Sequence, residues 1–322
     1  MSEAALLQLL DVLADGTLHS GETLAQRFGI SRAALAKRVA HLRDWGVEVA
    51  AQAGAGYRLH QPLERLDAAR IAAALAPATR VQVLIRTDST NTQMLAADPA
   101  CDPQVLFAES QTQGRGRRGR DWVSPFGANL YCSIGWTFAA WPARLTALPL
   151  AIAVALARVV AEVGLPEVGI KWPNDLHVGG RKLAGILIEP RGEAGGSCRV
   201  VVGVGLNVAM SAQQASAVTQ PWISLGEALA AVGKPLPSRN TLAAALAREL
   251  TTALGHFALH GFSPFAAEWQ RRDVLRDQAV RIEATPSFEG IARGVDGDGG
   301  LIVETSSGRQ LVHAGDVSVR AA

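Results

Sequence analysis

The chain has 322 residues, of which 48% are hydrophobic, and its formal net charge is only +2. A composition this apolar can bury a large core, which excludes a disordered or highly charged chain. The length predicts two or three domains. Because the net charge is small, any nucleic-acid binding must come from a local cluster of basic side chains.

The cysteines and the N-terminus bear on where the protein works. Cys101, Cys132 and Cys198 lie far apart, without CxxC or histidine-pair spacing, which argues against a disulfide framework or a zinc site. The N-terminal segment is acidic where a signal peptide would be basic. The most apolar run, Leu148–Ala157, is too short to span a bilayer. We therefore expect a cytoplasmic protein without membrane association.

Residues 1–62 predict a winged helix-turn-helix domain. Leucines at helical spacing between residues 6 and 13 predict a first helix, and residues 21–28 predict a second. A glycine then precedes a third helix, expected over residues 31–44, and this order is typical of a helix-turn-helix. Two β-prone runs around a Gly-Ala-Gly turn, within residues 47–59, predict the hairpin that forms the wing.

The third helix carries the features of a DNA-recognition helix. Leu35, Val39 and Leu42 form an apolar stripe at i, i+4 and i+7, while residues 23–43 contain five Lys or Arg and no acid. The capped start of this helix lies where recognition helices approach base edges. A module for protein contacts, or simply a solvated charged face, remains an alternative. The candidate DNA-binding residues are Ser31, Arg32, Lys37, Arg38 and His41.

The rest of the chain predicts two further domains and an α+β protein overall. Over residues 63–271, apolar β-like runs mix with helices expected near 145–162 and 241–260, which indicates a central mixed α/β domain. Over residues 272–322, short strands alternate with glycine-rich turns, which predicts a small C-terminal β-barrel.

The most unusual segment is the loop Gly114–Arg120, which reads GRGRRGR. It satisfies G-x-G-x-x-G as text, but a dinucleotide fingerprint needs a helix to open at the third glycine. Here residues 120–125 form a turn sequence, and arginines between the glycines would prevent close helix–strand packing. No P-loop motif is present either. A Rossmann domain or P-loop enzyme is therefore not expected.

Four arginines on a glycine-rich loop suit an anionic ligand that the loop wraps. Glycines let the backbone approach the ligand, and arginines supply planar charged donors for phosphate or carboxylate groups. RNA binding of the RGG type is the alternative, although the chain contains only this one isolated repeat within an otherwise globular sequence.

Two further segments present charged groups at defined positions. Lys171–Asp175 reads KWPND and predicts a turn that brings a cation, an amide and a carboxylate together. Arg181–Glu189 reads RKLAGILIE and predicts a buried strand with Lys182 at its start. A lysine held there suits fixing a transferring carboxyl or phosphate group. Taken singly, each segment could equally be a structural turn or a solvated strand end.

Together, these segments resemble the biotin–protein ligase family. The N-terminal domain with its wing sequence GAGYRL resembles the bifunctional branch that carries a repressor domain, so the resemblance covers nearly the whole chain. A lipoate or octanoate ligase of the same fold would not be expected to combine the arginine loop with KWPND. An inactive ligand-sensing transcription factor conflicts with the intact Lys182 and loop. The matching stretches are Ser89–Asn91, Gly114–Arg120, Trp122–Leu130, Lys171–Asp175, Arg181–Leu187 and Gly203–Asn207.

The resemblance implies an ATP-dependent, AMP-forming ligase. Biotin and ATP would give biotinoyl-5′-AMP and pyrophosphate, and biotin would pass to a lysine of a carboxylase biotin carrier domain. Mg²⁺ is expected with the ATP phosphates, while its direct protein ligands stay open. As an adenylate-bound homodimer, the protein would bind operator DNA and repress biotin synthesis genes. The C-terminal barrel would be SH3-like.

The resemblance also implies roles for individual residues. Lys182, Arg117 and Arg115 are the expected catalytic group, which holds the biotin carboxylate and the phosphate. Hydroxyl and amide groups suit the ureido head of biotin, and Trp122 offers a stacking face for adenine. The expected biotin-binding residues are Ser89, Thr90, Asn91, Gln111, Gly114, Arg115, Gly116, Arg117, Lys182 and Gly185. The expected nucleotide-binding residues are Arg120, Trp122, Asn174, Asp175, Asn207 and Arg320.

Overall fold

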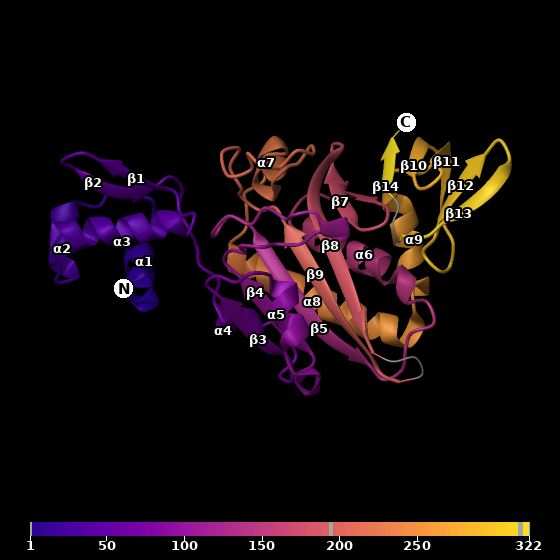
Figure 1. Cartoon of the computed structure of the whole chain (residues 1–322), viewed down its shortest axis with the longest axis horizontal. Helices are drawn as coiled ribbons and strands as arrows, with labels where there is room; N and C mark the ends of the chain where they lie inside the picture. The colour runs from indigo at the N-terminus through magenta and orange to yellow at the C-terminus, as the bar shows by residue number, and fades with distance from the viewer. Residues whose placement is uncertain (1, 193–195, 315–317, 322) are drawn as a thin grey trace. The chain divides into compact units, whose positions relative to one another are not determined.

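The computed structural model describes residues 2–192, 196–314 and 318–321, except for the side chains of residues 318, 320 and 321. It divides into two units. The first comprises Met1–Arg65 with Pro125–Ala128, and the second comprises Leu66–Ser124 with Asn129–Ala322. Figure 1 shows the order of the elements along the chain.

The first unit contains the expected helix-turn-helix and wing. Its elements are α1 (Glu3–Leu13), α2 (Gly21–Arg27), α3 (Arg32–Asp44), β1 (Val49–Gln52) and β2 (Gly56–Leu59). The Ser31 hydroxyl caps α3 by accepting a hydrogen bond from the Ala34 N–H at 3.2 Å. The apolar stripe Leu35, Val39 and Leu42 is buried, and β1 pairs with β2 in antiparallel fashion. The predicted N-terminal domain is therefore confirmed.

The second unit is built on a seven-stranded mixed sheet in the order β3-β4-β5-β9-β8-β7-β6. Only β3 and β4 are parallel; the remaining pairs are antiparallel. The strands are β3 (Arg80–Leu84), β4 (Gln104–Ala108), β5 (Leu130–Phe138), β6 (Gly169–Lys171), β7 (Asp175–Val178), β8 (Arg181–Arg191) and β9 (Cys198–Leu206).

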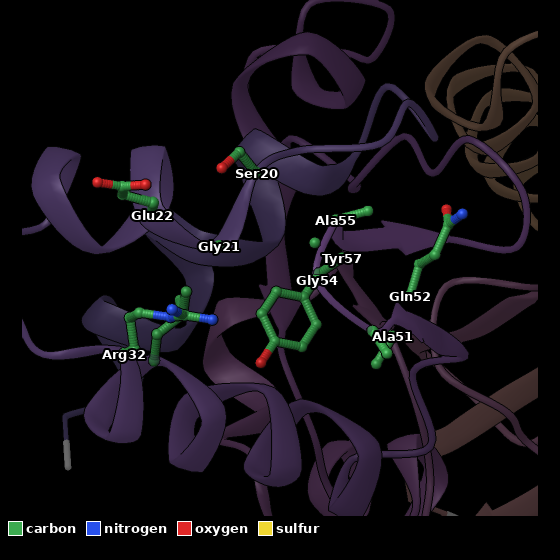
Figure 2. Close-up of a pocket in the computed structure, with 12 residues that line it drawn as sticks. Ser20, Gly21, Glu22, Arg32, Ala51, Gln52, Gly54, Ala55 and Tyr57 are labelled. Atoms are coloured by element: carbon green, nitrogen blue, oxygen red, sulfur yellow. The ribbon is translucent and has the colours of Figure 1, made fainter.

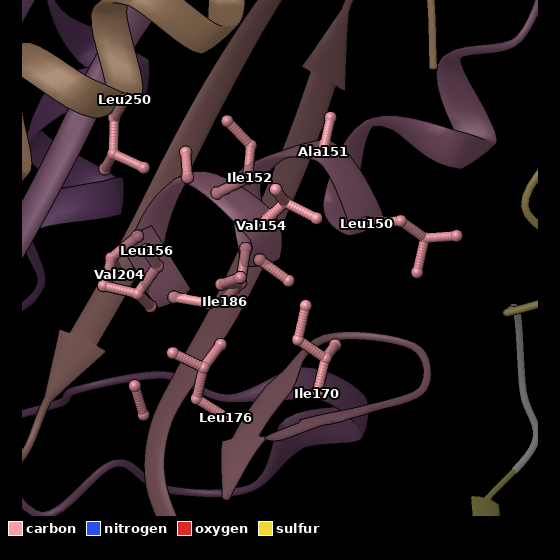
Figure 3. Packing of buried hydrophobic residues seen from close by; sticks show 14 of the residues in the cluster. Leu150, Ala151, Ile152, Val154, Leu156, Ile170, Leu176, Ile186, Val204 and Leu250 are labelled. Carbon is pink, nitrogen blue, oxygen red and sulfur yellow. The ribbon is translucent and has the colours of Figure 1, made fainter. Parts of the chain in front are cut away.

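Helices cover both faces of this sheet. The long helices α6 and α8 pack on one face, and the short α5 packs on the other, against β4, β5 and β9. Figure 3 shows buried side chains of this core, among them Ile152 and Leu156 of α6 and Ile186 and Val204 of β8 and β9, which belong to one hydrophobic cluster. The helices are α4 (Ala68–Ala72), α5 (Thr90–Ala96), α6 (Leu148–Glu162), α7 (Leu225–Ala231), α8 (Arg239–His260) and α9 (Ser263–Arg272).

Helix α6 is apolar enough to resemble a membrane span. The segment Leu145–Glu162 has 18 residues and a mean hydropathy of 1.8, which meets the length and composition of a spanning helix. In this structure the helix is part of the core, and 67% of that segment is buried inside the protein. A core helix of this kind is apolar on nearly every side because it is covered on nearly every side.

The C-terminal part is a small β domain. Its five antiparallel strands follow the order β13-β12-β11-β10-β14, so β13 and β14 are the edges of an open sheet, and the described strands show no closed barrel. The apolar side chains of Val280, Ile282 and Val303 are fully buried. The strands are β10 (Ala279–Glu283), β11 (Phe288–Val295), β12 (Leu301–Thr305), β13 (Gly308–Val312) and β14 (Ser318–Ala321).

Asp273, which follows α9, makes stability depend on pH. Burial raises its pKa from 3.8 to about 6, against the lowering effect of the Leu275 N–H. Its Oδ2 is buried and has no hydrogen-bond partner among the described residues. The folded state therefore binds this proton more tightly than the unfolded state, so stability falls as pH rises from about 4 to 6, and the full cost persists above 6.

We expect Asp273→Asn to stabilise the protein at pH 7.5, on the order of 1 kcal/mol, because it removes a buried charge. The gain should shrink as pH approaches 4. Urea unfolding of wild type and variant at pH 7.5 and pH 4.5 measures the difference. The exposed Asp44, replaced by Asn, serves as the control. A gain of equal size at both pH values would contradict the explanation.

Candidate functional site

A row of buried polar residues lies on the sheet face that α5 covers. Ser89, Thr90 and Asn91 are only 2%, 4% and 4% exposed. The Thr90 N–H and hydroxyl donate to Gln111 Oε1 at 2.8 and 3.1 Å. Ser133 Oγ on β5 lies 2.8 Å from Thr90 Oγ1 and 2.6 Å from Asn91 Oδ1. Four expected residues are thus brought together, and with Ser133 they form a buried cluster of hydroxyl and amide groups, the polar cluster.

Two glycines of β9 allow neighbouring side chains to lie directly against the strand. A Cβ on Gly203 would overlap Asn91 Oδ1, and a Cβ on Gly205 would overlap the indole of Trp122. Because both sites are bare backbone, Asn91 and Trp122 can lie directly against the strand. The Gly-Val-Gly sequence of β9 therefore shapes the floor of the site.

The arginine loop is folded back on itself. The Gly116 N–H donates to the Arg120 carbonyl at 2.7 Å, and the Trp122 N–H donates to the Gly114 carbonyl at 2.8 Å. Residues Arg117–Gly119 form a 3-10 turn in which Arg118 has φ 60°. No α-helix opens at the third glycine, as expected from the sequence, so the loop has none of the geometry of a dinucleotide fingerprint.

The arginine side chains of the loop reach different partners. Arg115 forms an ion pair of 2.9 Å with Glu189 at the far part of β8. Arg117 donates to Asn174 Oδ1 at 3.2 Å, in the KWPND turn, and to the carbonyl of Ala314 in the C-terminal domain. The two arginines therefore tie one loop to three segments that are distant in the sequence.

Lys182 lies beside Trp122 and Asp175. Its Nζ is 2.8 Å from Asp175 Oδ2 and 5.4 Å from the centre of the Trp122 ring. Gly185 adjoins it, since a Cβ there would lie 3.2 Å from Nζ. Among the described residues, Asp175 Oδ1 and Trp122 Nε1 are buried without hydrogen-bond partners. A cation next to unsatisfied polar atoms is an arrangement that a charged, polar ligand would complete.

His177, which lies on β7 like Asp175, is a titratable neighbour of Lys182. It pairs with Lys182 across the two strands. Burial lowers the pKa of its imidazole, an effect that the Asp175 carboxylate opposes. The ring Nδ1 lies 3.2 Å from the Gly180 carbonyl. His177 therefore adds no positive charge beside Lys182 near neutral pH.

The two expected asparagines hold the backbone of the site. Asn174 Nδ2 donates to the Ile186 carbonyl at 2.6 Å, and Asn207 Nδ2 lies 3.4 Å from the Lys182 carbonyl and 3.3 Å from the Ile223 carbonyl. Of the remaining expected nucleotide residues, Arg120 is exposed on the arginine loop. The side chain of Arg320 lies outside the described part of the chain.

Sequence reasoning missed three polar residues at this site. Ser133 lies inside an apolar strand, Ser124 accepts from Gln111 Nε2 at 3.0 Å, and Glu189 ends an apolar run. The alternation along β5 is the one signal that could have identified Ser133, because a serine at a position facing away from the core helices needs a polar partner.

No cysteine is prepared to act as a nucleophile here. Burial raises the pKa of the Cys132 and Cys198 thiols. A thiol that stays protonated is a poor nucleophile.

The basic residues of α3 form the second candidate site. Ser31, Arg32, Lys37 and His41 are exposed, while Arg38 stacks over the ring of Phe28 at 5.5 Å. Arg32 and Tyr57, both labelled in Figure 2, line a hollow of about 220 Å³ that is formed by the starts of α2 and α3 and by the wing. An exposed helix start beside a wing is the geometry with which such domains contact DNA.

Arg43 plays a structural part that the sequence did not reveal. Its Nε and Nη2 donate to the Val49 carbonyl at 3.0 and 2.8 Å. The guanidinium therefore joins the end of α3 to the first strand of the wing.

Comparison with known proteins covers all three parts of the chain. Residues 5–58 match an HTH domain, residues 83–207 match the biotin/lipoate A/B protein ligase family, and residues 277–320 match the biotin protein ligase C-terminal domain. The bifunctional ligase/repressor BirA of Escherichia coli is 42% identical over 318 residues, which cover 98% of this chain and 97% of that protein. The BirA of Bacillus subtilis is 28% identical over 306 residues, 93% of each chain.

The fold agrees with solved ligases. The biotin protein ligase of Aquifex aeolicus, solved with biotin and ATP, superposes with a TM-score of 0.64 at 23% identity, over 76% of this chain and 99% of that one. At this identity the likeness shows a shared fold. Since the E. coli relative matches over nearly its whole length, the chain belongs to the family of bifunctional biotin–protein ligases that carry an N-terminal repressor domain.

Proposed function

We propose that the polar cluster and Lys182 form one active site. In this site biotin and ATP would react to biotinoyl-5′-AMP, and biotin would then pass to a lysine of a carboxylase carrier domain. Ser89, Thr90 and Gln111 would bind the ureido head, because their hydroxyl and amide groups match its donors and acceptors. Asn91, Gly114, Gly116 and Gly185 complete the proposed walls.

The observation that carries this proposal is the position of Lys182. It lies over Trp122 and against Asp175. Trp122 covers Gly205 of β9 on the same sheet face on which Asn91 of the polar cluster covers Gly203. The carboxylate of a biotin bound at the polar cluster would meet the Lys182 cation beside the ring of Trp122, which is suited to stack on adenine. Asn174, Asn207, Arg120 and Arg320 are the further residues proposed to surround the nucleotide.

The chemistry needs no group that bonds covalently to the substrate. The biotin carboxylate oxygen bonds to the α-phosphorus of ATP, and the bond to the β-phosphate oxygen breaks, which releases pyrophosphate. Lys182 and Arg117 would stabilise the negative charge that builds on the phosphate oxygens. The carrier lysine amine then attacks the carbonyl, AMP leaves, and the amine loses its proton to solvent.

Mg²⁺ fits this site as a companion of ATP. Among the described residues no cluster of three His, Cys, Asp or Glu side chains forms a metal site. Asp175 Oδ1 is a buried oxygen without a hydrogen-bond partner in that same set, so it is the candidate carboxylate ligand. Bound Mg²⁺ would neutralise phosphate charge, with most of its ligands coming from ATP and water.

We further propose a cytoplasmic repressor that binds operator DNA as an adenylate-bound homodimer. Residues 1–60 carry six Lys or Arg against six acids, so a single domain attracts DNA phosphates only weakly. Two copies on two half-sites would supply the missing affinity. Closure of the C-terminal sheet into an SH3-like barrel remains part of the proposal.

One incubation tests the assignment. The full chain, mixed with biotin, ATP-Mg²⁺ and a biotin carrier domain, should release pyrophosphate and add one biotin to one lysine, which mass spectrometry measures. Lipoate replaces biotin in the control. Transfer of lipoate instead of biotin would assign a different ligase, and no transfer of either would indicate a ligand sensor.

A second arm of the same experiment tests the coupling to DNA. Biotin with ATP should raise both the dimer fraction, measured by sedimentation, and operator affinity, measured by gel shift. Added unmodified carrier domain should reverse both by consuming the adenylate. An unchanged dimer fraction and unchanged affinity would remove the coupling and leave the ligase assignment intact.

A further inference from the structure

Glu189 connects Arg115 of the arginine loop to Asn91 of the polar cluster. Its Oε2 accepts from Arg115 Nη2 at 2.9 Å and from Asn91 Nδ2 at 2.8 Å. Glu189 belongs to β8 and lies 26% exposed, whereas Asn91 is almost fully buried. One carboxylate oxygen thus joins a side chain of the arginine loop, Arg115, to a side chain of the polar cluster, Asn91.

These contacts belong to a longer chain of hydrogen bonds that begins at Arg115 on the arginine loop and ends at Trp122, two residues after that loop. From Asn91 it passes through Ser133 Oγ to Thr90 and on to Gln111 Oε1. From Gln111 Nε2 it continues to Ser124 Oγ, which donates to the Trp122 carbonyl at 2.9 Å. Two of the proposed ureido-binding residues, Thr90 and Gln111, therefore lie in the middle of a chain that runs from the arginine loop to the segment that directly follows it.

We infer that Glu189 is a positioning residue for biotin binding: it holds Asn91 in the geometry that receives the biotin head, and it holds Arg115 where that arginine would meet the biotin carboxylate. This inference rests on the proposed function. A carboxylate that accepts two hydrogen bonds fixes both donors, and the bonds to an ionised acceptor are the stronger kind. Without the charge, both hydrogen bonds lose their ionised acceptor, so Arg115 is held less firmly on β8, and so is the Asn91 amide, whose other acceptor is the Leu187 carbonyl at 3.4 Å.

A second role for the ion pair predicts the opposite effect. If Glu189 only held Arg115 away from its ligand, its removal would free the arginine and tighten biotin binding. If it positions Arg115, its removal weakens biotin binding. The direction of change in biotin affinity therefore distinguishes a positioning residue from an inhibitory latch.

The test is Glu189→Gln in the full chain. We expect the Kd of biotin, measured by calorimetry without ATP, to rise about tenfold, which corresponds to about 1.4 kcal/mol. The KM of ATP should stay within error, and the unfolding temperature is measured to check that the variant folds, because Glu189 is only 26% exposed and contacts the buried Asn91. In the double variant with Arg115→Ala, the loss of biotin affinity should be smaller than the sum of the two single losses, since both changes remove the contact between Glu189 and Arg115, while the contact with Asn91 is affected only by Glu189→Gln.

The matched control is Glu227→Gln, which removes the ion pair of 2.6 Å between Glu227 and Arg181 at the other end of the same strand. It should leave the biotin Kd unchanged. Tighter or unchanged biotin binding in Glu189→Gln, or strictly additive losses in the double variant, would overturn the inference. Wild-type pyrophosphate release with biotin is measured in parallel, so failure of the proposed function shows in the wild type and failure of this inference shows only in the variant.

Discussion

Lys182→Ala should lower the rate of biotin-dependent pyrophosphate release by about 10³-fold, in the range seen when one preorganised charge-stabilising group is lost. Its Nζ lies 2.8 Å from Asp175 Oδ2 and 5.4 Å from the centre of the Trp122 ring, and alanine removes one of the two cations, with Arg117, that are proposed to stabilise charge on the phosphate. Single-turnover release of pyrophosphate at saturating biotin and ATP measures the effect.

The matched control for this result is Lys234→Ala, because Lys234 is an exposed lysine after α7. It should retain wild-type rates. Thermal unfolding of Lys182→Ala checks that the unpaired Asp175 carboxylate has not unfolded the domain. A folded variant whose rate stays within a few-fold of wild type would show that Lys182 is not the charge-stabilising group.

Arg117→Gly should let the adenylate escape before biotin is transferred. Arg117 joins the loop to Asn174 and to the carbonyl of Ala314, so glycine removes both ties at once. A loop that no longer covers the mixed anhydride exposes it to water and to free amines. We expect biotin on many lysines of an added bystander protein, at least tenfold above wild type, measured by mass spectrometry.

Arg118→Gly is the control, because it changes the neighbouring residue of the same loop at a backbone position, φ 60°, that glycine tolerates. Labelling by this variant should stay confined to the carrier lysine. If Arg117→Gly behaves the same way, the loop does not retain the adenylate through Arg117.

The sequence allowed much of the architecture to be predicted, because its signals are local. The helix-turn-helix follows from the Ser31 cap and the spacing of Leu35, Val39 and Leu42, and the position of Lys182 follows from the apolar run behind it. A cap and a periodic stripe need only neighbours in the sequence. These are the elements that the structure reproduces.

The contacts within the site could not be predicted in the same way. Ser133 meets Thr90, and Glu189 meets Arg115, only because β5, β8 and β9 pair in a fixed register across long stretches of chain. In the sequence, Ser133 is one polar residue in an apolar strand and Glu189 is a strand end. Register between distant strands is set by the whole core, which no short motif reports.

The bare backbone at Gly203 and Gly205 has a consequence for engineering. A binding site is usually widened by replacing a side chain with a smaller one. At Gly203 and Gly205 of β9 there is no side chain that could be replaced in this way. Libraries aimed at accepting bulkier biotin analogues for orthogonal labelling should therefore leave β9 alone. They should instead vary the side chains that lie against β9 or beside it, such as Asn91 and Ser133, whose atoms a smaller residue can remove.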